Sequence, residues 1–329
     1  MIRIENLVKR YGDKTALDGI TFSVEEGEIV GFLGPNGAGK STAMNILTGY
    51  LSSTSGEAYI NGLNVLESPK EAKKTIGFLP EQPPLYLDMT VREYLNFVYD
   101  LKGCTLNRKK HLAEICEVVQ IRDVYPRLIR NLSKGYRQRV GIAQALVGNP
   151  KVVIFDEPTV GLDPRQIIEI RDLIRRLGRD HTVILSTHIL PEAQAVCDRI
   201  VIINEGKIVA NEKREDLQTL IGGNRRFEAH ICGSKAEILS LIRQIPGVSS
   251  VECTGGGELD SFAFVVECRP GEDVRKMLFN RMASAGCPIV SLTALGATLE
   301  DIFISLVDRP KEKPGKKTRR IDLNNGGEK

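Results

Sequence analysis

The chain has 329 residues, and its 45 lysine and arginine residues nearly balance its 42 aspartate and glutamate residues. This length predicts about two domains, and the near-balance of charge argues against a protein whose bulk coats nucleic acid. The mean hydropathy is −0.13, and the longest apolar runs have the length of strands rather than the ~20 residues of a membrane-spanning helix. We therefore expect a globular chain that does not cross a membrane by itself.

The first part of the chain alternates strand-like and helix-like segments. Strands are predicted from alternating or continuous apolar residues at 3–8, 20–24, 28–33, 152–155, 183–186 and 200–204. Helices are predicted at 90–102, 108–120 and 133–147. Thr90 and Glu93 form a capping-box pattern, and Glu205 with Gly206 marks a hairpin turn. The pattern predicts an α/β domain at residues 1–221 with a helical subdomain at about 83–147.

A different pattern follows residue 222. Strand, helix, strand, strand, helix and strand are predicted in turn at 227–232, 235–244, 248–253, 262–267, 272–285 and 289–293, with a turn at 254–258. This order is typical of a small ferredoxin-like α+β layer, and one more helix is predicted at 298–306. We expect an accessory domain at 222–308 that serves dimer contact, partner docking or regulation. Residues 309–329 are basic and nearly free of apolar side chains, which predicts a disordered tail.

Cysteines and histidines give no metal signature. The seven cysteines are widely spaced without a C-x-x-C pair, and the four histidines show no ligand spacing. We therefore expect neither a zinc site nor a disulfide framework.

The strongest motif is a phosphate-binding loop. Its residues are Gly34, Pro35, Asn36, Gly37, Ala38, Gly39, Lys40, Ser41 and Thr42. They match G-x-x-x-x-G-K-[ST] directly after a predicted strand, the context that separates a P-loop from a flexible glycine-rich turn. The backbone N–H groups can surround an anion, Lys40 adds a positive charge, and the Ser41 hydroxyl can bind Mg²⁺.

An acidic pair supplies the second half of this chemistry. Asp156 and Glu157 follow four apolar residues of a predicted buried strand. The carboxyl ends of parallel strands face the ligand crevice, so both carboxylates are expected there. Asp156 is predicted to hold Mg²⁺, and Glu157 to orient the attacking water or accept its proton.

Residues 156–164, DEPTVGLDP, resemble the Walker B motif and D-loop of the ATP-binding cassette (ABC) ATPases. Residues 132–139, LSKGYRQR, are similar to the signature of that family, and residues 185–188, LSTH, to its switch histidine. Tyr11 stands where the family has an aromatic residue that stacks on adenine. The resemblance covers residues 1–220 and implies a P-loop cassette with a mixed core sheet and a helical subdomain.

The resemblance implies a Mg²⁺-dependent ATPase that works as a dimer around two ATP molecules. His188 would contact the γ-phosphate, and Asp163 belongs to the D-loop. The signature would contact the ATP of the partner subunit through Leu132, Ser133, Lys134, Gly135 and Tyr136. ATP and Mg²⁺ are the expected cofactors, with no other stable metal. The partner cassette is a second copy of this chain or a related chain.

Two motifs depart from the family pattern. Lys134 replaces a glycine and Tyr136 a glutamine of the usual signature, and Lys134 either adds charge near the nucleotide or points to water. Residues 76–86 resemble the Q-loop, but Glu81 stands at the usual glutamine and Gln82 follows it. Either side chain could face the metal, and we favour Glu81 because a carboxylate ligates Mg²⁺ through water as an amide oxygen does.

The resemblance favours the ATPase subunit of a transporter whose membrane permease is a separate chain, with export as the expected direction. Such a subunit would lie on the cytoplasmic side of the cell membrane, held there by the permease. Leu85, Tyr86 and Met89 would form an apolar groove for the permease, unless they belong to the core. One alternative is an ABC ATPase that acts on ribosomes or nucleic acid, although we do not expect this chain to bind nucleic acid. The other alternative is a generic P-loop kinase.

Overall fold

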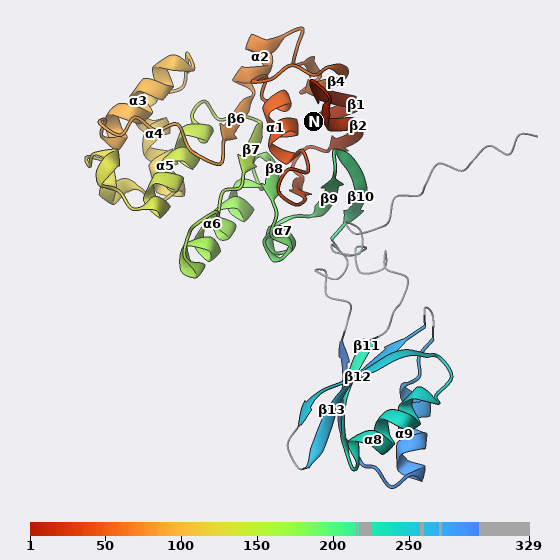
Figure 1. Cartoon of the computed structure of the whole chain (residues 1–329). Helices are drawn as coiled ribbons and strands as arrows, with labels where there is room; N and C mark the ends of the chain where they lie inside the picture. The colour runs from red at the N-terminus through yellow and green to blue at the C-terminus, as the bar shows by residue number, and fades with distance from the viewer. Residues whose placement is uncertain (215, 217–225, 257–259, 270–271, 296–329) are drawn as a thin grey trace, which may run out of the picture.

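The computed structural model describes every residue except 215, 217–225, 257–259, 270–271 and 296–329 (Figure 1). The strands up to residue 213 are β1 (Ile2–Tyr11), β2 (Lys14–Val24), β3 (Ile29–Leu33), β4 (Ser55–Ile60), β5 (Leu63–Asn64), β6 (Ile76–Leu79), β7 (Val152–Asp156), β8 (Thr182–Thr187), β9 (Arg199–Asn204) and β10 (Lys207–Lys213). The helices are α1 (Lys40–Leu47), α2 (Pro69–Lys74), α3 (Val91–Leu101), α4 (Arg108–Val118), α5 (Lys134–Leu146), α6 (Pro164–Leu177) and α7 (Leu190–Val196), with short 3₁₀ turns at Arg122–Val124 and Ile129–Asn131.

A six-stranded sheet in the order β10-β9-β3-β8-β7-β6 forms the centre of this part. Its five strands from β9 to β6 are parallel, and β10 closes one edge as the antiparallel partner of β9. Leu33 pairs with Thr187, and Asp156 pairs with Ser186. The loops that follow β3, β7 and β8 therefore leave the sheet at one edge, side by side.

The two faces of the sheet pack against different layers. Alternate residues of β3 and β7, such as Phe32 and Ile154, pack with α1 and with a second, antiparallel sheet of order β2-β1-β4-β5. The intervening residues, such as Leu33 and Phe155, pack with α5, α6 and α7 on the other face. Figure 1 shows α1 on one side of the sheet, and α6 and α7 on the other. The predicted α/β cassette fold is confirmed.

The helices α3, α4 and α5 form the predicted helical subdomain (Figure 1). The predicted capping box is present: Thr90 N donates to Glu93 Oε2 at 2.8 Å, and Glu93 N donates to Thr90 Oγ1 at 3.2 Å. The bond from the Thr90 backbone lowers the pKa of Glu93.

Lys102 donates to three carbonyls at the end of α5, and burial lowers its pKa to about 8. These contacts fix α5, whose first turn carries the signature.

The region from residue 226 forms a separate layer. Its elements are β11 (Arg226–Cys232), α8 (Lys235–Arg243), β12 (Val248–Gly256), β13 (Ser261–Cys268), α9 (Arg275–Ser284) and β14 (Ile289–Leu295). The strands pair antiparallel in the order β12-β13-β11-β14, and both helices pack on apolar residues of this sheet. The element order is the predicted one, and the strand order is that of a ferredoxin-like layer.

Some predicted boundaries are wrong. The turn expected at 254–258 overlaps a strand, because β12 continues to Gly256, whose partner is Phe262 across the ladder. The helix expected from 272 begins at Arg275. The hairpin turn is confirmed, since Glu205 and Gly206 both adopt positive φ between β9 and β10. The predicted helix at 298–306 and the predicted tail at 309–329 lie outside the described residues.

Candidate functional site

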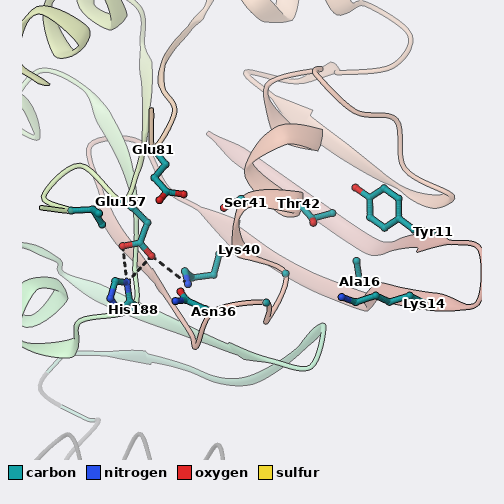
Figure 2. A pocket seen from close by; sticks show the side chains of 13 residues that line it. Tyr11, Lys14, Ala16, Asn36, Lys40, Ser41, Thr42, Glu81, Glu157 and His188 are labelled. Atoms are coloured by element: carbon teal, nitrogen blue, oxygen red, sulfur yellow. Dashed lines mark hydrogen bonds and ion pairs between the residues drawn. The ribbon is translucent and has the colours of Figure 1, made fainter. Parts of the chain in front are cut away.

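A cavity of about 700 Å³ opens at the edge where the parallel strands end (Figure 2). Its lining comes from segments far apart in the sequence: Tyr11, Lys14, Ala16, Asn36, Gly37, Gly39, Lys40, Ser41, Thr42, Glu81, Glu157, Val160 and His188. The volume lies within the range of small-molecule sites. The structure thus joins the predicted phosphate loop, one residue of the acidic pair, the predicted switch histidine and the predicted aromatic residue in one site.

At two of its glycines the phosphate loop passes too close to the neighbouring backbone for a side chain to fit. A Cβ on Gly34 would lie 2.4 Å from the carbonyl oxygen of Ile203, and one on Gly39 would lie 2.6 Å from that of Ala16. Gly39 also has a φ of 111° and gives α1 no side-chain cap. The first N–H groups of α1 are therefore left for another acceptor, which is how helix N-termini bind anions.

Lys40 and Glu157 form a buried ion pair across the cavity. Lys40 Nζ lies 3.3 Å from Glu157 Oε1, and both side chains are less than a tenth exposed. Lys40 also donates to the carbonyl oxygens of Gly34 at 2.8 Å and Pro35 at 3.3 Å. A bound phosphate would compete with these carbonyl oxygens for the ammonium group. Hydrogen bonds from an ammonium group to phosphate are stronger than those to neutral carbonyl oxygens, because both partners are charged.

Glu157 is also the partner of His188. Nδ1 of His188 lies 3.0 Å and 2.9 Å from the two carboxylate oxygens (Figure 2). Glu157 has a φ of 50°, in the left-handed region that costs a non-glycine residue about 1 kcal/mol or more. Its backbone N–H donates to the Ser186 carbonyl at 3.0 Å. The bend directs the carboxylate toward Lys40 and His188.

Asp156 ends β7 and is buried, with 4% of its surface exposed. Its Oδ1 atom is buried with no hydrogen-bond partner. A buried carboxylate oxygen without a partner is costly, and a divalent cation would satisfy it. Asp156 does not line the cavity itself, but Ser41 does, from the first turn of α1.

The two Q-loop candidates are placed differently. Glu81 lines the cavity, and its carboxylate lies between Glu157 and Ser41 in Figure 2. Gln82 is exposed and is not part of the lining. Of the two residues, Glu81 is therefore the one whose side chain a bound ligand or metal would meet.

Tyr11 lies at the far end of the cavity from Glu157 (Figure 2). It ends β1, pairs with Lys14 across the hairpin to β2, and leaves 47% of its surface exposed. Lys9 Nζ lies 5.2 Å from the centre of its ring. Lys14, Ala16 and Val160 also line the cavity and were not predicted. The pairing of Tyr11 with Lys14 could have indicated the first two of these.

The signature residues lie outside this cavity. Ser133 caps α5, and its Oγ atom accepts from Tyr136 N at 3.3 Å. Tyr136 donates its hydroxyl to Asp123 at 2.7 Å, and this bond raises the pKa of Tyr136. A Cβ on Gly135 would lie 2.6 Å from Oε1 of Gln166, so the first turns of α5 and α6 approach closely. None of the residues from Leu132 to Tyr136 contributes to the lining.

Lys134 of the signature lies beside the D-loop segment that contains Asp163. Lys134 is exposed, and its ammonium group lies over Gly161, 2.0 Å from the position that a Cβ there would take. Asp163 caps α6 by accepting from Gln166 N at 2.9 Å. The predicted signature and D-loop therefore form one surface, separate from the lining of the cavity.

The residues after the Q-loop divide between core and surface. Leu85 and Met89 are partly buried and pack against the large core cluster, so the expectation of an exposed groove is wrong for these two. Tyr86 is 54% exposed, and its ring lies edge-on to that of Phe97 at 5.5 Å. Leu87, Phe97 and Leu101 are also exposed.

The fold and the site together define a P-loop ATPase of the cassette type. The sequence profile of the family described as ABC transporter matches residues 17–160. The linearmycin resistance ATP-binding protein LnrL of Bacillus subtilis is 33% identical over 94% of this chain and 99% of its own length. The bacitracin transport ATP-binding protein BcrA of Bacillus licheniformis is 31% identical over 93% of this chain and 97% of its own length.

Solved structures agree with these relatives. A dimeric ATP-binding cassette in a post-hydrolysis state with ADP and phosphate matches with a TM-score of 0.60 and 29% identity, over 65% of this chain and 99% of that chain. An ATP-binding subunit of an ABC transporter matches with a TM-score of 0.62 over 68% of this chain and 93% of that chain. The chain belongs to the ABC transporter ATP-binding proteins, and it is an ATP-binding and ATP-hydrolysing subunit.

The position of Tyr11 leads to a prediction about nucleotide affinity. We expect Tyr11→Ala to weaken ATP binding about tenfold, since stacking of a base on an aromatic ring contributes ~1–3 kcal/mol. Tyr11→Phe keeps the ring and should change the affinity less than about twofold. The measurement is the dissociation constant of a fluorescent ATP analogue, and equal affinities of the Ala variant and the wild type would contradict the prediction.

Proposed function

We propose that this chain hydrolyses MgATP as one of two cassettes that close head to tail around two ATP molecules and drive a separate membrane permease. The observation that carries the proposal is the cavity in which Lys40, Glu157 and His188 meet at the N-terminus of α1. Residues 1–221 form the motor with a helical subdomain at about 83–147. Residues 222–308 are the accessory domain, and 309–329 the tail.

The phosphates of ATP would enter the phosphate loop at residues 34–42, with the adenine on Tyr11 at the other end of the cavity. Lys40 would then exchange the carbonyl oxygens of Gly34 and Pro35 for the β- and γ-phosphate oxygens. That movement separates Lys40 from Glu157 and leaves the carboxylate free to act on water.

Glu157 would orient the attacking water and accept its proton. His188 lies within hydrogen-bonding distance of that carboxylate. It would hold the γ-phosphate from the same side as the phosphate loop. The reaction breaks the bond between the γ-phosphorus and the bridging oxygen, and water supplies the new oxygen. Both side chains sit on loops at the ends of neighbouring strands, which fixes their separation.

The residues present fit a bound Mg²⁺. Asp156 Oδ1 is a buried oxygen without a partner, Ser41 offers a hydroxyl, and Glu81 a second carboxylate on the cavity wall. These are the hard oxygen donors that Mg²⁺ takes, and the ion neutralises negative charge on the phosphates when it is bound. Asp156, Ser41 and Glu81 would hold it directly or through water.

The second cassette completes the site in this proposal. Although Gly135 is buried, Ser133 is exposed and presents its hydroxyl at the N-terminus of α5, on a surface outside the chain's own cavity. These groups suit the γ-phosphate of an ATP held by the partner. Lys134 and Asp163 would lie at the same contact, which can form only while that phosphate is present.

Export is the direction that the relatives support. LnrL is named for linearmycin resistance, and BcrA for bacitracin transport. A lantibiotic transport ATP-binding protein of Streptococcus pyogenes is 35% identical over 69% of this chain and 99% of its own length. We infer that this chain drives the export of an antibiotic-like compound. These names give no support to an ATPase of ribosomes or nucleic acid.

The permease would hold the chain at the cytoplasmic face of the cell membrane. No helix in the described part of the chain has both the length and the apolar composition of a membrane span. Tyr86, Leu87 and Phe97 are exposed beside one another at the end of the Q-loop and suit an apolar helix of the permease.

Replacement of Glu157 by glutamine tests the catalytic assignment. We expect Glu157→Gln to keep ATP binding but to lower turnover at least ~100-fold, the usual contribution of a general base. The variant should also elute as a dimer on size exclusion with ATP, because hydrolysis no longer opens the closed dimer. Lys40→Ala is the comparison, and it should weaken ATP binding itself about tenfold or more. Normal turnover by Glu157→Gln would contradict the proposal.

The metal assignment of the Q-loop is tested by two neighbouring variants. Glu81→Ala should raise the Mg²⁺ concentration needed for half-maximal ATPase activity about tenfold, while Gln82→Ala should change it less than about twofold. If Glu81→Ala left the ATPase rate unchanged and Gln82→Ala abolished it, Gln82 would be the metal-facing residue.

The transporter role is tested by isolation of the complex. A tagged full chain purified from detergent-solubilised membranes of its own cells should bring down an integral membrane protein. Recovery of ribosomal proteins without any integral membrane protein would contradict the proposal.

A further inference from the structure

A buried carboxylate outside the cavity connects the two loops that carry the catalytic groups. Glu192 lies in the first turn of α7, is 2% exposed and is not part of the cavity lining. Its Oε2 atom accepts from Thr159 Oγ1 at 2.6 Å and from Thr187 Oγ1 at 3.2 Å. Its Oε1 atom lies 4.0 Å from a guanidinium nitrogen of Arg171 on α6.

The two threonines hold the segments on either side of the reaction centre. Thr187 directly precedes His188, and its hydroxyl oxygen also accepts from Ile189 N at 3.1 Å. This hydroxyl therefore braces the backbone before and after His188. Thr159 follows Glu157 by two residues and opens the loop that leads to Asp163.

This arrangement is costly as a source of stability alone. A carboxylate loses its hydration when it is buried, and the attraction to a cation 4.0 Å away seldom repays that loss. The Nε atom of Arg171 is itself buried with no hydrogen-bond partner. What the carboxylate provides is a single acceptor atom for one side chain from each of the two loops that follow the neighbouring strands β7 and β8.

We propose that Glu192 is a positioning residue for ATP hydrolysis, which holds the His188 turn and the loop from Thr159 to Asp163 in register with Glu157. The inference rests on the proposed roles of Glu157 and His188. It predicts that loss of Glu192 affects the chemical step and spares ATP binding, because the phosphate loop makes none of these contacts.

The test compares kcat, KM and ATP affinity of the full chain. Glu192→Ala should lower kcat ~10- to 100-fold, the effect of a small displacement of reacting groups, with the dissociation constant of ATP within about twofold of wild type. Glu192→Gln keeps an oxygen that can accept from both threonines, and it should restore kcat to within about threefold of wild type. A kcat of Glu192→Ala within twofold of wild type, or an equal loss in Glu192→Gln, overturns the proposal.

Two threonines of the same strand give a matched control. Thr187→Val removes the hydroxyl that Glu192 holds, whereas Thr182→Val removes an equally buried hydroxyl at the other end of β8, which accepts from Gly27 N. Thr187→Val should lower kcat at least about fivefold without a matching loss of ATP affinity, and Thr182→Val should only lower the melting temperature. Equal losses of kcat in both variants overturn the proposal, even if Glu192→Ala does not fold.

The outcome is distinguishable from failure of the proposed function. Loss of turnover in Glu157→Gln together with normal turnover in folded Glu192→Ala rejects only the positioning role. Normal turnover in Glu157→Gln rejects the catalytic assignment on which both rest.

Discussion

The buried ion pair of Lys40 and Glu157 joins the first turn of α1 to the end of β7, and the site is arranged around it. The pair exists because parallel strands end at one edge of the sheet, so that loops distant in the sequence meet there. His188 reaches the same carboxylate from the end of β8. One carboxylate thus contacts both a cation, which a bound phosphate would attract, and an imidazole.

The phosphate loop and the surface formed by Lys134 and Asp163 differ in their surroundings. The carbonyl oxygens of Ile203 and Ala16 lie too close to Gly34 and Gly39 for either position to carry a Cβ. Lys134 and Asp163 are exposed instead. The proposed function requires both features, because the nucleotide needs a defined site and a second cassette needs an exposed surface on which to close.

The sequence predicted motifs and local structure correctly where these depend on residues close together in the chain. The P-loop, the cap at Thr90 and the strand that ends at Asp156 follow from residue types at short spacing. The elements β4, β6, α6 and α7 were not predicted, although α6 does carry a local signal, since Asp163 caps it, Pro164 opens it and its buried residues recur at helical spacing. The boundary of β12 was missed because Gly255 and Gly256 favour a turn locally, and only pairing with β13 extends the strand.

The sequence by itself determined the class of protein and located the phosphate-loop motif and the acidic pair, because each of these motifs is contiguous in the chain. Only the tertiary structure decided that Glu81 rather than Gln82 lines the cavity, and that Leu85 and Met89 are partly buried against the core. It also decided that Glu192 accepts from Thr159 and Thr187. These outcomes depend on how loops from separate strands pack together, and no spacing along one segment records that packing.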